Sequence, residues 1–178
     1  MYDRIRPSWV VRVVLWQGWG TALRVGLLLW GCAVLQGVLA PAIALWGAMP
    51  DLLLLMLGFL TLRLNPVPAA GAGFFAGLLH ASMLDQTVGS LIISRMLAAF
   101  AVAWLPALLH RHHLLSACLA CALMVLLANL LLYLTAPSIT GWEWWHATGG
   151  IMVYNTLLAA PAYGLLGRVL PRYQEDIR

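Results

Sequence analysis

Six long apolar stretches account for most of this chain and decide the solvent in which it folds. They cover about residues 22–40, 51–64, 69–84, 90–109, 114–136 and 151–170. Of the 178 residues, 63% are hydrophobic and only 9% are charged, whereas a soluble domain is about one quarter charged. Because so few charges cannot form a hydrated surface, the stretches are predicted to be helices that cross the ~30 Å hydrocarbon core of a membrane.

Short breaks separate the stretches. Proline ends the first at Pro41 and interrupts the chain again in "NPVP" at 65–68, and "DQTVG" at 85–89 is typical of a turn. A polar, aromatic loop, "PSITGWEWWHATGG", is expected at 137–150. The sequence therefore predicts an all-α polytopic membrane protein with six transmembrane helices in one bundle.

The predicted membrane domain covers residues 19–171. An interfacial segment, 1–18, precedes it, because arginines alternate there with tryptophan and valine, as in helices that lie on a membrane surface. A short polar tail, 172–178, follows it.

The arginines predict the orientation of the bundle. With six spans both termini lie on one side, and that side receives Arg4, Arg6, Arg12, Arg63, Arg111, Arg168, Arg172 and Arg178. The opposite connections carry only the acidic residues Asp51, Asp85 and Glu143. The positive-inside rule then places both termini in the cytoplasm. It also explains the net charge of +4 without a nucleic-acid partner.

Three ionisable side chains, His80, Asp85 and Arg95, fall within sixteen positions of the third and fourth stretches. One interpretation is a structural pair, with Asp85 at the outer turn and Arg95 reaching across to it or out to water. The other is a ligand site at the outer mouth, joined by Glu143 and His146. A polar cluster inside a membrane bundle favours such a site by default.

Other residues are predicted to hold the helices together. Gly73 and Gly77 have the G-x-x-x-G spacing, which lets two helix backbones approach closely. This spacing serves internal packing and homodimers alike. The amides expected to bond across helices are Gln36, Asn129 and Asn155.

Asp51 follows Pro50 at the start of the second stretch. A carboxylate there is expected to cap the helix, because it accepts from free backbone N–H groups and complements the helix dipole.

Motifs that carry chemistry are not found in this chain, and no catalytic residue, cofactor or metal is expected. The histidines of "HRHH" at 110–113 have no carboxylate or thiolate nearby in sequence, and Cys32, Cys118 and Cys121 lie in apolar runs as buried hydrophobes do. The tryptophans of "GWEWWH" at 141–146 are typical of an interfacial belt, and a docking site for a partner is the alternative.

Two segments together resemble the rod shape-determining protein MreD family of bacteria. The first is "LQGVLAPAIALWGAMPDLLLLMLGFLTLR", in which Gln36, Pro41, Pro50 and Asp51 stand in the family's order. The second is "VYNTLLAAPAYGLLGRVLPR", in which Asn155 precedes small, apolar and then basic residues. The glycine-rich third stretch lies between them, so the resemblance covers nearly the whole chain.

One position departs from the family pattern. The family commonly has an aspartate four residues after the second glycine of the third stretch, where this chain has Ala81. Asp85 follows one turn later, with Gly89 at the glycine of the next turn. The acidic group has therefore moved by a turn, or its role is lost.

The resemblance implies a non-catalytic membrane scaffold of the cell-elongation machinery in the bacterial inner membrane. The implied partners are MreC, RodA and a class B penicillin-binding protein, with MreB filaments contacted indirectly. It also implies a fold similar to the substrate-binding components of energy-coupling-factor transporters. A small-molecule-binding transport component is therefore the alternative function.

Overall fold

The structure is a computed structural model that describes residues 19–44, 48–84, 88–107, 114–137 and 140–169. The regular elements in these ranges are six α-helices and one 3-10 helix, Leu105–Ala107, which confirms the all-α prediction. The α-helices are α2 (Trp19–Ala42), α3 (Leu52–Thr61), α4 (Pro66–Ala81), α5 (Val88–Val102), α6 (Leu114–Thr135) and α7 (Gly141–Val169). The predicted N-terminal segment, the polar tail, the HRHH cluster and Asp85 lie outside the described residues.

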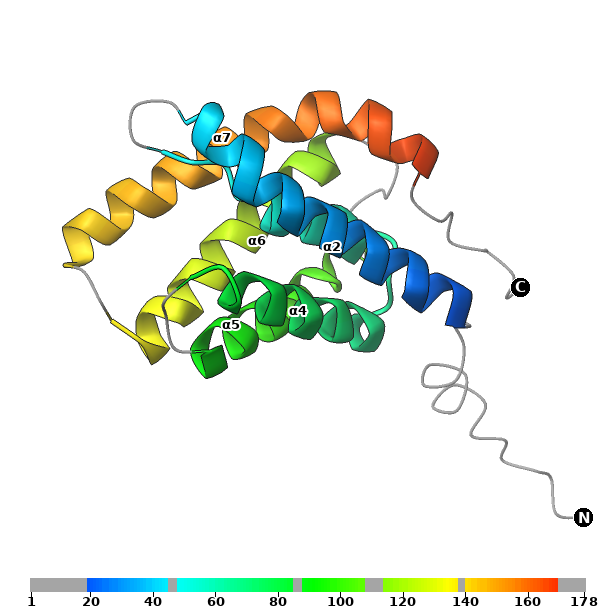
Figure 1. Ribbon diagram of the computed structural model, residues 1–178, viewed down its shortest axis with the longest axis horizontal. Coiled ribbons are helices and arrows are strands. Elements are labelled where there is room, and N and C mark those ends of the chain that lie inside the picture. The colour runs from blue at the N-terminus through cyan, green and yellow to red at the C-terminus, as the bar shows by residue number, and fades with distance from the viewer. Residues whose placement is uncertain (1–18, 45–47, 85–87, 108–113, 138–139, 170–178) are drawn as a thin grey trace, which may run out of the picture.

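The helices pack around α3, the shortest of them. In the view of Figure 1, α4 and α5 lie side by side below, α6 crosses the centre, and α2 and α7 run above. Every residue of α3 from Leu53 to Thr61 is buried, although ten residues rise only about 15 Å. Leucines on all sides of α3 therefore form the core of the bundle.

Two of the helices, α2 and α6, are long and apolar enough to cross a membrane. They differ in their packing, because 39% of the most apolar window of α6 is buried but only 22% of that of α2. α3 and α5 are apolar but shorter, with 10 and 15 residues.

The predicted aromatic loop is wrong from Gly141 onward, because α7 begins there, ten residues before the predicted stretch. Thr140 explains the early start. Its backbone N–H and its hydroxyl donate to Glu143 Oε2 at 3.0 and 2.9 Å. The Glu143 N–H donates back to the Thr140 hydroxyl at 3.4 Å. This capping box, Thr-x-x-Glu, satisfies backbone groups at the first turn.

The fourth predicted helix, expected to reach residue 109, is also wrong at its end. α5 stops at Val102 and a 3-10 turn follows at Leu105–Ala107. Pro106 explains the difference, because proline lacks an N–H and disfavours helical geometry at the residue before it.

Gly73 and Gly77 lie where α4 crosses α5. A Cβ at Gly73 would lie 2.5 Å from the Arg95 carbonyl oxygen, and one at Gly77 would lie 2.6 Å from Ile92 Cα. Both distances are too short for any side chain, so the backbones touch only because these residues are glycines. Gly89, on α5, has open space instead, because a Cβ there would have no atom of a neighbouring element within 4 Å.

Gly77→Ala is expected to destabilise the protein by about 1–3 kcal/mol, because the methyl must push the α5 backbone away. Thermal unfolding in detergent micelles measures this as a lower Tm. Gly89→Ala is the matched control and should leave Tm unchanged or slightly higher. Equal Tm values for the two variants would contradict the close packing of α4 on α5.

Candidate functional site

The site centres on the residues that lead into α3. Asp51, the residue before the helix, has an extended backbone with φ −99° and ψ 92°, and its Oδ1 accepts from the Leu54 N–H at 2.9 Å. The Leu52 N–H donates to Gln36 Oε1 at 2.6 Å. A helix start leaves its first N–H groups without partners. Side chains supply those partners here, inside the bundle.

Two amide side chains from other helices each donate one hydrogen bond to the backbone of the segment before α3 and accept one from it. From α2, Gln36 Nε2 donates to the Pro50 carbonyl at 3.0 Å. From α7, Asn155 Nδ2 donates to the Asp51 carbonyl at 2.9 Å, and Asn155 Oδ1 accepts from the Asp51 N–H at 3.0 Å. Asn155 is fully buried, so its loss would leave the Asp51 N–H without a partner or water, and the Asp51 carbonyl would keep only the Leu55 N–H.

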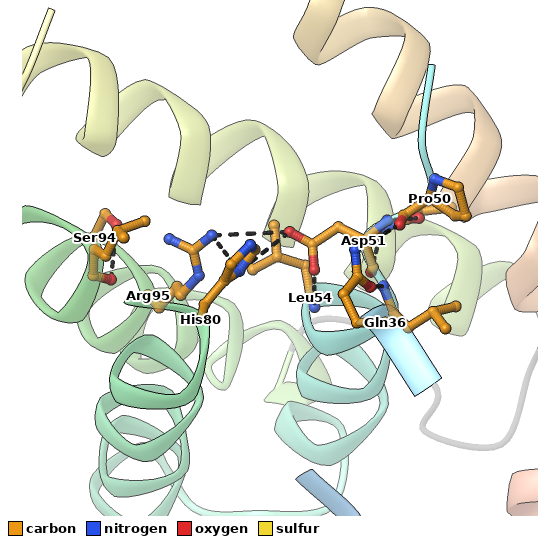
Figure 2. A network of polar contacts seen from close by, with 10 residues as sticks. Gln36, Pro50, Asp51, Leu54, His80, Ser94 and Arg95 are labelled. Atoms are coloured by element: carbon orange, nitrogen blue, oxygen red, sulfur yellow. Dashed lines mark hydrogen bonds and ion pairs between the residues drawn. The ribbon is translucent and has the colours of Figure 1, made fainter. Parts of the chain in front are cut away.

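The second oxygen of Asp51 faces two basic side chains (Figure 2). Asp51 Oδ2 lies 3.8 Å from Arg95 Nη2 of α5 and 3.6 Å from His80 Nδ1 of α4. Arg95 Nη2 lies 2.7 Å from His80 Nδ1. The first two distances are too long for hydrogen bonds, so Asp51 attracts Arg95 mainly by charge. We call Gln36, Asp51, His80, Arg95 and Asn155 the Asp51 junction.

The contact with Arg95 decides the protonation of His80. A guanidinium has donors and no acceptor, so the ring nitrogen that faces it must accept. His80 Nδ1 is therefore unprotonated, and the neutral ring carries its proton on Nε2. The junction then holds one negative charge, on Asp51, and one positive charge, on Arg95.

Arg95 is the most buried charged residue of the junction, with a relative exposure of 2%. Within the described part of the chain, no group accepts from its Nε or Nη1. Buried donors of this kind are costly, so Arg95 depends strongly on Asp51 and His80.

The junction joins five of the six described α-helices. α2 contributes Gln36, α3 follows Asp51, α4 contributes His80, α5 contributes Arg95, and α7 contributes Asn155. The sequence suggested each of these residues and grouped His80 with Arg95, but it did not predict that Asp51, Gln36 and Asn155 lie with them. Asp51 and Arg95, which form the charge pair, are 44 positions apart.

Other residues considered from the sequence lie elsewhere. Asn129 accepts from the Trp144 indole through its backbone carbonyl, at 3.2 Å. Glu143 caps α7, and the His146 ring packs edge-on against Trp142, with centroids 4.5 Å apart. These contacts belong to the start of α7, away from the five junction residues.

The polar side chains of the junction make structural contacts. Its acid caps a helix, its histidine accepts from arginine, and its two amides bond backbone groups. Within the described ranges, no group of three His, Cys, Asp or Glu side chains is placed to hold a metal ion. The site can hold helices to one another.

This fold and this junction define an all-helical protein in which buried polar residues join the helices, two of them long and apolar enough to cross a membrane. The chain belongs to the MreD family: the family model for rod shape-determining protein MreD matches residues 20–158. No curated protein and no solved structure matches it. The family gives the chain a role in determining rod shape, within the Mre shape-determining system.

Removing both charges of the buried pair is expected to cost less than the sum of the losses from removing each charge alone. Arg95→Met leaves the Asp51 carboxylate buried beside an apolar side chain, with an expected loss of about 3–5 kcal/mol. Asp51→Asn keeps a capping oxygen but removes the charge, and it leaves Arg95 unpaired. The double variant should therefore be more stable than the sum of the two losses predicts, by about 0.5–3 kcal/mol.

Reversible unfolding of the four proteins in mixed micelles gives this coupling energy directly. Asp51→Leu is a further comparison, because it removes the cap as well and should be less stable than Asp51→Asn by about 1 kcal/mol. Strictly additive losses in Asp51→Asn and Arg95→Met would show that the two side chains do not interact.

Two substitutions of His80 test its role as a hydrogen-bond acceptor. In His80→Gln the amide oxygen can still accept from Arg95, whereas His80→Lys brings a second cation to the same place. We expect His80→Lys to lower Tm much more than His80→Gln. His146→Lys, at an exposed position on α7, is the matched control. A Tm for His80→Lys equal to that of His80→Gln would contradict the assigned tautomer.

Proposed function

We propose that this chain is a non-catalytic scaffold of the bacterial cell-elongation complex, which supports sidewall peptidoglycan synthesis by binding MreC. The observation that carries the proposal is that the buried polar residues contact one another or the backbone. Gln36 and Asn155 bond backbone groups of the segment before α3, and Asp51, His80 and Arg95 interact with one another. A rigid bundle with its polar groups turned inward presents apolar helix faces to membrane-embedded partners. RodA and a class B penicillin-binding protein are the further partners proposed, with MreB contacted indirectly.

In the proposed topology, residues 19–171 form six spans in the inner membrane with both termini in the cytoplasm. The distribution of arginines supports this orientation. The end of α3, next to Arg63, and the start of α4 then lie near the cytoplasmic surface. We also propose a fold similar to the substrate-binding components of energy-coupling-factor transporters.

Affinity purification of the tagged chain from native membranes in mild detergent tests the proposed partners. Recovery of MreC, together with RodA or the penicillin-binding protein, is the expected result. Recovery of paired ATPases with a coupling membrane subunit would contradict the scaffold and indicate a transport component instead.

Substitutions of the two intramembrane asparagines, Asn129 and Asn155, form a matched pair. Each variant is expressed in cells that lack the native protein. Asn155→Leu leaves the buried Asp51 N–H unpaired, at about 1–3 kcal/mol, and leaves the Asp51 carbonyl with the Leu55 N–H alone, so we expect round cells. Asn129→Leu keeps the backbone carbonyl that accepts from Trp144, so we expect rods. Microscopy gives cell shape, and immunoblots of membranes give protein level. Rods with Asn155→Leu would show that the function does not need the junction.

A further inference from the structure

The polar contacts of the Arg95 guanidinium in the described part of the chain are made by one nitrogen, Nη2. This atom lies 2.7 Å from His80 Nδ1 and 3.8 Å from Asp51 Oδ2, and both dashed lines from Arg95 in Figure 2 start there. Nε and Nη1 each have less than 1 Å² of exposed surface, and no described group accepts from them. These two atoms carry more than half of the N–H groups of a guanidinium.

Buried donors of this kind need an acceptor. In folded proteins about nine-tenths or more of buried polar groups are paired, either with the protein or with ordered water. Arginine cannot remove the problem by losing a proton, because its guanidinium stays protonated in proteins. The acceptor for Nε and Nη1 therefore comes from outside the described part of the chain.

Size and charge restrict what this acceptor can be. A lipid headgroup or a metabolite is too large to reach atoms with so little exposed surface. An anion is disfavoured by charge, because Asp51 and Arg95 already cancel and His80 is neutral. A further negative charge would be buried without a partner of its own. A water molecule is small and neutral, and it can both accept and donate.

Water can reach the junction beside Asp51 and His80, whose side chains keep exposed fractions of 11% and 10%. Asp51 Oδ2 is 3.6 and 3.8 Å from the two basic side chains, too far for direct hydrogen bonds. This oxygen can therefore accept from a water, and polar contacts longer than about 3.5 Å are commonly bridged in that way. Buried waters make about three hydrogen bonds each, and Arg95 and Asp51 supply the partners.

We propose that the Asp51 junction binds internal water at Arg95. Water molecules accept from Nε and Nη1, and one of them also donates to Asp51 Oδ2. The water joins the start of α3 to α5 by hydrogen bonds, where the two charged side chains alone attract each other only across a longer distance. The site depends neither on the proposed partners nor on the proposed topology.

Solution NMR on the purified full chain, with isotope-labelled arginine in deuterated micelles, tests the proposal. The Arg95 Nε–H signal is identified by its NOEs to the His80 ring and by its loss in Arg95→Lys. A bound water gives this proton a water cross-peak of opposite sign in NOE and ROE spectra, whereas proton exchange gives the same sign in both. We expect the bound-water pattern at Arg95 and the exchange pattern at Arg24, which is exposed.

Ser94→Ala is the control for a signal relayed by a hydroxyl. Ser94 precedes Arg95, and its hydroxyl donates to the Leu91 carbonyl at 3.1 Å. The bound-water cross-peak should keep its full intensity in this variant, and its loss would assign the signal to the hydroxyl and overturn the proposal. Replacing chloride by gluconate should leave the Arg95 signal in place. A saturable shift of that signal with chloride would identify a bound anion and overturn the water site.

An Arg95 Nε–H without a water cross-peak, in protein that retains the NOEs to His80, would also overturn the proposal. A shift of this signal in Asp85→Asn would then identify a carboxylate of the chain as the acceptor. The isolated protein is sufficient for these measurements, so they are independent of co-purification with MreC. Failure to recover MreC would contradict the proposed function and leave the water site in place.

Discussion

The structure depends on the hydrogen bonds that allow α3 to begin inside the bundle. A helix start at a protein surface can use water for its first N–H groups, but α3 is buried from its first turn. The N–H groups of Asp51, Leu52 and Leu54 donate instead to the side chains of Asn155, Gln36 and Asp51. Because two of these side chains come from other helices, capping α3 also fixes α2 and α7 against it.

Asp51 also links the start of α3 to α4 and α5. One carboxylate oxygen caps α3 and the other faces Arg95 and His80. The Arg95 carbonyl lies against Gly73, so α4 and α5 approach as a close pair near the charge. Buried charges are costly to desolvate and contribute little net stability. We therefore interpret the pair as fixing how α4 and α5 sit on α3, because only one packing brings the opposite charges together.

Many of these structural features could be predicted from the sequence. The others could not, for definite physical reasons. The apolar stretches predicted helices, Pro50-Asp51 predicted a cap, and Gly73 and Gly77 predicted close packing, because each of these is a local pattern. The contact of Arg95 with Asp51 needs tertiary structure, since three helices and two turns set their distance. The start of α7 could have been predicted, because Thr140 and Glu143 have the spacing of a capping box. The aromatic composition of that segment indicated a loop instead.

The most direct test of this account is residue-resolved amide hydrogen exchange of the protein in lipid nanodiscs. Helix ends normally exchange quickly, because their N–H groups are exposed and fray. If the Asp51 junction organises the bundle, the amides of Asp51, Leu52 and Leu54 will exchange as slowly as those in the middle of α6. Rapid exchange at these three amides, with α6 still protected, would contradict the account.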